Sequence, residues 1–143
     1  MPIFKYQPVI TTGPYGTDHR PQNNNLVNLC ELDGWRYVSI PTDSQTIIPD
    51  ELITWTIVEL DSTLRELLKK NSPICQSIDQ QVLDKIREKY SLNDELYFAR
   101  IAIGDLRGTY QLEPGENELL IQYQNDIESI RTWGRQEIAN LGL

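Results

Sequence analysis

Histidine, cysteine and metal-binding motifs are scarce in this sequence, and each shortage narrows the chemistry to expect. Among 143 residues there is one histidine, His19, and there are two cysteines, Cys30 and Cys75. A nucleophilic serine or cysteine normally needs a nearby base, most often histidine. His19 lies in a proline-rich segment, where a catalytic side chain would lack rigid support. The cysteines form no CxxC or zinc-ligand spacing, so we expect two free thiols, no metal site and no cofactor.

Basic residues and long apolar runs are also in short supply. The net charge is −8 and the sequence pI is about 4.6, with acids outnumbering bases in both halves of the chain. No basic face is available for phosphates, so we expect no nucleic-acid partner and no membrane partner. The longest apolar run, within residues 52–60, is too short to span a bilayer, and the N-terminus does not resemble a signal peptide.

Motifs for catalysis are missing as well. There is no phosphate-binding GxxxxGK[ST] and no HExxH, and the GDLRG segment lacks the lysine of a phosphate loop. The acidic pair Asp94-Glu95 fits a helix start, where the macrodipole favours negative charge. Trp35, Tyr37 and Trp55 would stack on sugar rings only if they shared an exposed sheet face, and packing in a core is the favoured interpretation. We therefore predict that the protein is not an enzyme.

The amino-acid composition and the apolar pattern change along the chain. Residues 1–25 hold four of the eight prolines, which disfavour helix and predict an extended arm. Residues 26–60 predict a small antiparallel sheet, because LVNLCEL and WRYVSI flank Asp33-Gly34, a strong hairpin signal. The segment 52–60 is predicted as a third strand, with a helix as the alternative.

From residue 61 onward the apolar residues follow a helical period. A first helix over 61–71 would be capped by Asp61 or Ser62, and a second over 77–90 would open with a capping box of Ser77 and Gln80. A third would be capped by Asn93 or Asp94 and end near Gly104, with a strand as the alternative, followed by a loop over 104–115. The sequence thus predicts an α+β fold in which the arm 1–25 precedes a single domain over 26–143, β-rich over 26–60 and a bundle of three to four helices over 61–143.

The last helix has the most regular pattern, an apolar stripe from Leu120 to Leu141 in steps of three and four residues. The stripe either covers the domain's own core, which is the favoured interpretation, or packs against another subunit. Gly134 within it would let a neighbouring backbone approach closely. Our candidates for interface residues in the arm and in this helix are Phe4, Tyr6, Tyr15, Tyr123, Ile127, Ile130, Trp133, Gly134 and Leu141.

Two segments in the C-terminal half, IREKYSLNDELYFARIAIG and YQNDIESIRTWGRQEIANLGL, have a recognisable form. A YS-x-DDE-like helix start precedes an arginine-bearing helix, and a last helix ends with R-x-W-G-R and LGL. Over residues 77–143 this resembles small proteins encoded near the tail-fibre and baseplate genes of phages and prophages. The matching residues are Tyr90, Ser91, Asp94, Glu95, Arg100, Tyr123, Arg131, Trp133, Gly134, Arg135, Leu141, Gly142 and Leu143.

The resemblance implies a structural adaptor of a bacteriophage tail, in the baseplate or the tail fibre, assembled in the host cytoplasm and retained in the virion. It would act without catalysis, by docking on other tail proteins in an oligomer or a hetero-assembly. One alternative is a tail-fibre assembly chaperone that is absent from the mature virion. A carbohydrate-binding or carbohydrate-active protein is the remaining alternative.

Overall fold

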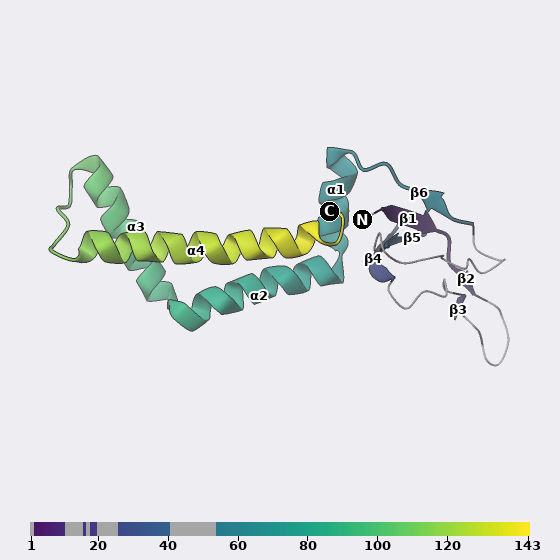
Figure 1. The fold of residues 1–143 in the computed structure, drawn as a ribbon, viewed down its shortest axis with the longest axis horizontal. Helices are drawn as coiled ribbons and strands as arrows, with labels where there is room; N and C mark the ends of the chain where they lie inside the picture. Colours follow the sequence, from purple (N-terminus) through teal and green to yellow (C-terminus); the bar gives the residue numbers. More distant parts are fainter. Residues whose placement is uncertain (1, 11–15, 17, 20–25, 41–53) are drawn as a thin grey trace. The chain divides into compact units, whose positions relative to one another are not determined.

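The computed structural model describes residues 2–10, 16, 18–19, 26–40 and 54–143, and it confirms the predicted α+β fold. The chain forms two compact units (Figure 1): a sheet unit of residues 1–77 with 137–143, and a helical unit of residues 78–136. Helices α2 and α4 each contribute to both units, and the single domain over 26–143 stays a prediction. The strands are β1 Ile3–Tyr6, β2 Val9–Ile10, β3 Asp18–His19, β4 Val27–Leu32, β5 Trp35–Ser39 and β6 Thr56–Ile57, and the helices are α1 Ser62–Asn71, α2 Pro73–Lys89, α3 Leu92–Arg107 and α4 Glu116–Ala139.

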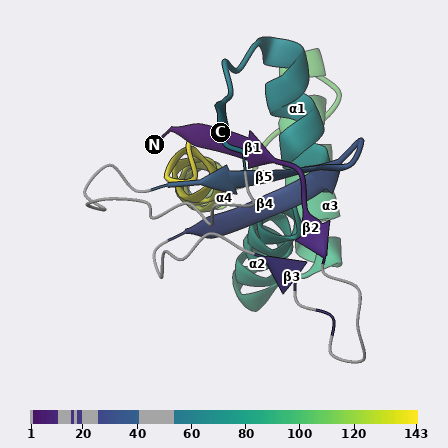
Figure 2. The same cartoon turned by 90° about the vertical axis from the view of Figure 1, so that its right-hand side faces the viewer.

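The main sheet has four antiparallel strands in the order β4-β5-β1-β6, and its three longest strands lie side by side in Figure 2. The predicted hairpin is confirmed: β4 and β5 are joined by Asp33 and Gly34, whose φ values of 52° and 80° are the left-handed values that a type I′ turn requires. Residues 52–60 were predicted as a strand; of the described residues 54–60, only Thr56–Ile57 form one, the short edge strand β6.

The first described residues of the arm, 2–10, are extended as predicted, but residues 3–6 belong to the sheet. β1 lies between β5 and β6, so that Phe4 pairs with Val38 on one side and with Ile57 on the other. Alternation places Ile3 and Phe4 on opposite faces of the sheet, and both faces are covered by apolar side chains. The sheet therefore begins at residue 3, not at residue 26.

The core of the sheet unit depends on an irregularity in β4. The pairing of β4 with β5 shifts between Asn28 and Cys30, which leaves Leu29 as an extra, unpaired residue. Because of this bulge the consecutive residues Leu29 and Cys30 both pack on the same core. That core contains Ile3, Leu29, Tyr37, Leu68, Cys75 and Leu143.

The N-cap of α1 is the predicted residue, whereas the N-cap of α2 is not. The Asp61 side chain accepts a hydrogen bond from the Leu64 backbone N–H at 2.7 Å, as predicted for α1. The capping box predicted at Ser77 is wrong, because α2 begins four residues earlier at Pro73. Proline suits a first helical turn, where its missing N–H is not needed. The Ser72 hydroxyl accepts from the Cys75 N–H at 3.4 Å and so serves as the cap.

The third helix also differs from the prediction at both ends. Ser91, not Asn93 or Asp94, is its N-cap: the Ser91 hydroxyl accepts from the Asp94 N–H at 3.1 Å, and the Asp94 carboxylate accepts from the Ser91 N–H at 2.7 Å. The helix does not end near Gly104 but continues to Arg107. Gly104 is needed for a different reason, because a Cβ there would lie 2.5 Å from Cβ of Tyr110.

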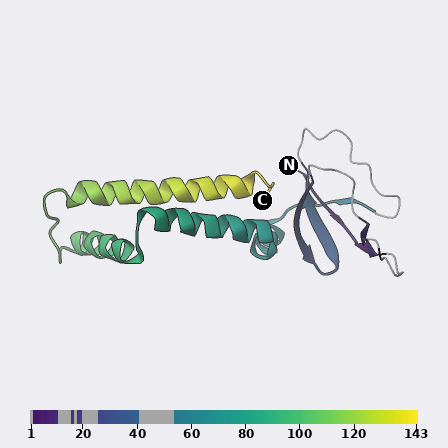
Figure 3. The same cartoon turned by 90° about the horizontal axis from the view of Figure 1, so that it is seen from below.

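The fourth helix ends before Leu141, which the sequence had placed within it. In the helical unit α2 and α4 run antiparallel and side by side (Figure 3), and α3 packs against the first half of α4 through Phe98, Ile101 and Leu120. Across the described part of the chain, no helix is long and apolar enough to cross a membrane.

Candidate interaction surface

The arm residues proposed for docking pack within the sheet unit. Tyr6 is fully buried, with its ring centroid 5.2 Å from that of Trp55, and Phe4 meets the same indole edge-on at 6.0 Å. Tyr15 lies outside the described residues. Docking of the arm on a neighbour therefore stays a prediction, and two of its three aromatic anchors already have partners inside the chain.

The aromatic residues considered for sugar stacking do not form one exposed platform. Tyr37 is 8% exposed in the core of the sheet unit, and Trp35 packs against that core with Nζ of Lys5 4.7 Å from its ring centroid. Trp55 belongs to the separate cluster around Tyr6. This arrangement favours the interpretation that the three rings are core residues.

The candidates from the last helix are mostly engaged inside the helical unit. Tyr123 stacks on Phe98 with a centroid distance of 4.6 Å and an interplanar angle of 13°. Tyr90 meets the Tyr123 ring edge-on at 5.0 Å, a favourable aromatic geometry. Ile127 is buried and Ile130 is half-buried. The regular stripe of α4 thus has intrachain partners over this part of its length.

The close approach predicted for Gly134 is made by α2 of the same chain. A Cβ at this position would lie 2.5 Å from Cγ2 of Val82. The neighbouring Trp133 ring packs beneath Lys85, whose Nζ lies 4.6 Å from the ring centroid. Leu141, beyond the helix, packs on the core of the sheet unit. The intrachain contacts already explain why these residues are placed as they are. Docking of these residues on another subunit stays a prediction.

A tyrosine–carboxylate contact joins the residue that follows α2 to α4. The Tyr90 hydroxyl donates to Oδ2 of Asp126 at 2.7 Å, and Nζ of Lys89 lies 3.6 Å from Oδ1 of the same residue. The hydrogen bond to Asp126 is the main cause that raises the pKa of Tyr90 to about 12, with desolvation second. Tyr90 therefore stays a neutral hydrogen-bond donor at physiological pH.

Replacing Tyr90 by phenylalanine is expected to cost about 0.5–1.5 kcal/mol of stability at neutral pH, the usual net value of one hydrogen bond. Because the pKa is raised from near 10 to about 12 on folding, the bond's contribution is fully present below pH 10 and is lost as the pH rises towards 12. Urea denaturation at neutral and alkaline pH measures the free energy of unfolding of the wild type and of Tyr90→Phe. Wild type should lose more stability in that window than Tyr90→Phe, and equal losses would contradict the assignment.

A groove of about 520 Å³ lies beside the second half of α3. Its walls include Tyr97, Arg100 and Tyr110, and the Tyr110 hydroxyl lies 2.8 and 3.0 Å from the two carboxylate oxygens of Glu116. The hydrogen bond to that carboxylate raises the pKa of Tyr110 to about 12, and desolvation together with Glu116 raises the pKa of Tyr97. Both phenols therefore remain protonated at neutral pH.

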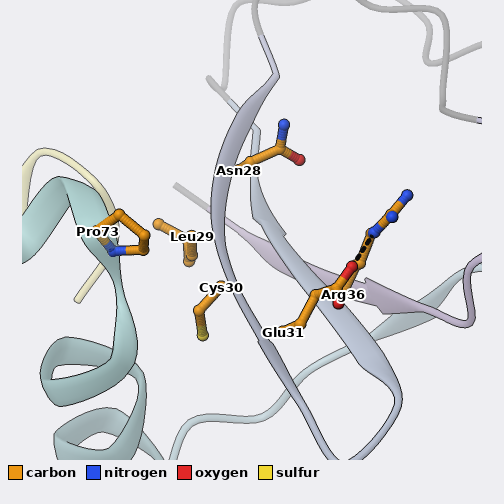
Figure 4. A pocket seen from close by; sticks show the side chains of 6 residues that line it. All are labelled: Asn28, Leu29, Cys30, Glu31, Arg36 and Pro73. Carbon is orange, nitrogen blue, oxygen red and sulfur yellow. Dashed lines mark hydrogen bonds and ion pairs between the residues drawn. The ribbon is translucent and has the colours of Figure 1, made fainter.

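A smaller hollow of about 240 Å³ lies along β4 in the sheet unit. Figure 4 shows Leu29 pointing towards Pro73 and Asn28 pointing away from it, while Glu31 and Arg36 form an ion pair. Burial raises the pKa of Cys30, and the nearby Cys75 raises it further. Cys30 therefore remains a thiol at neutral pH, unlike the low-pKa thiolate of a catalytic cysteine.

The outer side of α3 carries an apolar stripe that we call the α3 stripe. It consists of Leu92, Leu96, Ala99, Ile103 and Leu106, and its four large side chains are 59%, 54%, 56% and 86% exposed, in that order. At 3.6 residues per turn these five positions share one side of the helix. The buried residues Phe98, Ile101 and Gly104 occupy the opposite side.

Sequence reasoning missed this stripe because it placed the interface candidates in the arm and the last helix. The available signal was the alternating spacing of four and three residues from 92 to 106. A helix with apolar residues on both sides needs partners on both sides, and here only one side has a partner within the described residues. The α3 stripe is therefore the candidate interaction surface.

Comparison with known proteins adds no assignment: no family model, no curated protein and no solved structure matches the chain. Within the described ranges, no group of three or more His, Cys, Asp and Glu residues could hold a metal ion. The candidate surface consequently rests on the geometry of α3.

Proposed function

We propose that this chain is a non-enzymatic structural subunit of a bacteriophage tail, in the baseplate or the tail fibre, that acts by docking on neighbouring subunits. The observation that carries the docking role is the α3 stripe, in which four large apolar side chains are each at least 54% exposed on one side of one helix. Contiguous exposed apolar surface of this kind is typical of protein interaction sites.

The assignment to a phage tail is supported by the resemblance in the C-terminal half. Several of the shared residues build the helical unit that presents the α3 stripe. Ser91 and Asp94 cap α3, and the rings of Tyr90 and Tyr123 contact Phe98 of that helix. Gly134 allows the close packing of α2 on α4. On this proposal the partners are other tail proteins, and the chain is assembled in the host cytoplasm and retained in the virion.

The proposal is tested by quantitative mass spectrometry of purified particles from the source virus. A structural subunit should be present at a fixed copy number per tail. Absence from particles, together with recovery from infected-cell lysate bound to a fibre protein, would instead identify an assembly chaperone. The same exposed stripe would then serve a transient complex.

Variants locate the docking surface within that experiment. Leu106→Glu should reduce incorporation, whereas Leu119→Glu should not, because Leu119 is also exposed in the helical unit but lies outside the α3 stripe. Deleting residues 1–25 is not a usable test of the arm, since it removes β1 from between β5 and β6. Tyr15→Ala probes the arm while leaving β1 intact.

A further inference from the structure

We infer that the α3 stripe pairs with the α3 stripe of a second copy of this chain, the two helices lying parallel and in register. The inference rests on the proposed docking role of the stripe and adds the partner and its orientation. Three features support this pairing: the spacing of the stripe, the charges beside it, and its position opposite the buried side of α3.

The spacing of the stripe is that of a two-stranded coiled coil. Leu96 and Ile103 lie seven residues apart and occupy the position called a, while Leu92, Ala99 and Leu106 follow a second seven-residue repeat at position d. Isoleucine at a and leucine at d favour parallel two-stranded pairing. The small Ala99 lies at the centre of the stripe, where the two helices would come closest.

The charges beside the stripe are complementary to those of a second copy. Glu95 occupies position g and Arg100 the next position e, on opposite flanks of the stripe. In a parallel, in-register pair each g side chain faces the e side chain five residues further along the other helix. Glu95 of each copy therefore faces Arg100 of the other, and the symmetry forms this pair twice.

Antiparallel pairing of the same stripes lacks this complementarity. It would place Ala99 opposite Ala99 of the second copy, and it would bring the two Arg100 side chains to face each other across the symmetry axis. Like charges at this distance are unfavourable. The flanking charges thus favour the parallel arrangement.

Both charged groups are available for this contact. Among the described residues Arg100 forms no ion pair, and its side chain is exposed. Glu95 already forms an ion pair with Arg87 through Oε2 and accepts from the Tyr123 hydroxyl through Oε1 at 3.4 Å. A carboxylate has about four acceptor sites, so Glu95 can also accept from Arg100 of a second copy.

The length of α3 sets the expected strength. Its 16 residues span about 24 Å, little more than two heptads, and the contact area is correspondingly small. We expect a reversible dimer with a dissociation constant on the order of 10–100 μM. At moderate concentration such a dimer dissociates and re-forms. Its formation is favoured where an assembly holds copies of the chain close together, because their effective concentration is then higher.

Sedimentation equilibrium of the full chain across this concentration range is the direct test. The mass should rise with concentration from the 16.6 kDa monomer to twice that value. Leu106→Glu should raise the dissociation constant at least about tenfold, because it replaces an apolar contact with two facing charges. Leu119→Glu is the matched control and should leave the constant unchanged. Circular dichroism checks that both variants are folded.

Two further variants test the orientation. Arg100→Gln should weaken a parallel dimer about two- to fivefold, whereas an antiparallel dimer would be unaffected or tightened. Leu106→Cys should form an interchain disulfide under mild oxidation, because the two cysteines are adjacent in the parallel arrangement. In an antiparallel pair they would lie about 21 Å apart along the axis. Wild type under the same oxidant controls for Cys30 and Cys75.

A chain that remains monomeric throughout the range, or a dimer that is insensitive to Leu106→Glu, would overturn the pairing. A dimer without the Leu106→Cys crosslink would overturn the parallel orientation. These results are separable from the proposed function. A monomeric chain that is still incorporated into particles refutes only the pairing, whereas a dimeric chain that is absent from particles refutes only the structural-subunit role.

Discussion

Replacing Leu68 by alanine is expected to lower the free energy of unfolding of the sheet unit by about 2–5 kcal/mol. Leu68 is the one buried residue of α1, and its side chain is fully enclosed in the core that also contains Ile3, Leu29 and Tyr37. Alanine would remove the apolar side chain and leave a cavity against the sheet. Urea denaturation measures the loss, and hydrogen exchange in β1, β4 and β5 shows which unit has lost it.

The adjacent Leu67 provides the matched control. It lies in the same helix but is 45% exposed, so Leu67→Ala carries the same change in helix propensity with little loss of buried contact. We expect a cost below about 1 kcal/mol. Equal losses for the two variants would show that α1 does not pack on the sheet through Leu68.

Replacing Gly134 by alanine is expected to destabilise the helical unit by about 1–2 kcal/mol. In an exposed helix the same change would stabilise by up to about 1 kcal/mol. Here the new Cβ would lie 2.5 Å from Cγ2 of Val82, and the stiffness of valine about χ1 limits relief of the clash. Overpacking of this kind costs about 1–3 kcal/mol, which outweighs the gain in propensity.

A double-mutant cycle separates these two effects. Val82→Ala removes the obstructing methyl group, so Gly134→Ala in that background should stabilise the protein by about 0.5–1 kcal/mol. The sign of the alanine effect should therefore reverse between the two backgrounds, as measured by urea denaturation. If Gly134→Ala stabilises the wild-type chain, the glycine does not serve the packing of α2 on α4, and a role in docking would be favoured.

The features that the sequence predicted well are local. The turn at Asp33-Gly34 requires left-handed φ values that these two residue types tolerate, and the period of α4 is visible over several turns. The caps of α2 and α3 were misplaced because Ser72, Ser77, Ser91 and Asn93 are all competent caps. The choice among them depends on the first-turn proline of α2 and the reciprocal bonds of Ser91 and Asp94.

The features that the sequence did not reveal depend on contacts between distant residues. Residues 3–6 pair with 36–39, and no local pattern states which strand an extended segment will join. The apolar stripe of α4 predicted a buried side but not that α2 and α3 would cover it. The helix over 92–107 was left ambiguous because it contains several residue types that favour strands. The α3 stripe was overlooked because the interface candidates were placed in the arm and the last helix.

The core that joins Ile3 to Leu143 also affects the order of events during synthesis. The helical unit, residues 78–136, is one continuous segment whose contacts are complete once it has left the ribosome. The sheet unit must wait for residues 137–143, which are synthesised after the helical unit and complete its core. Until then the strands have incompletely covered apolar surface and exposed edges, the state most prone to aggregation. A chain that stops at residue 136 would therefore keep the helical unit and lack a finished sheet core.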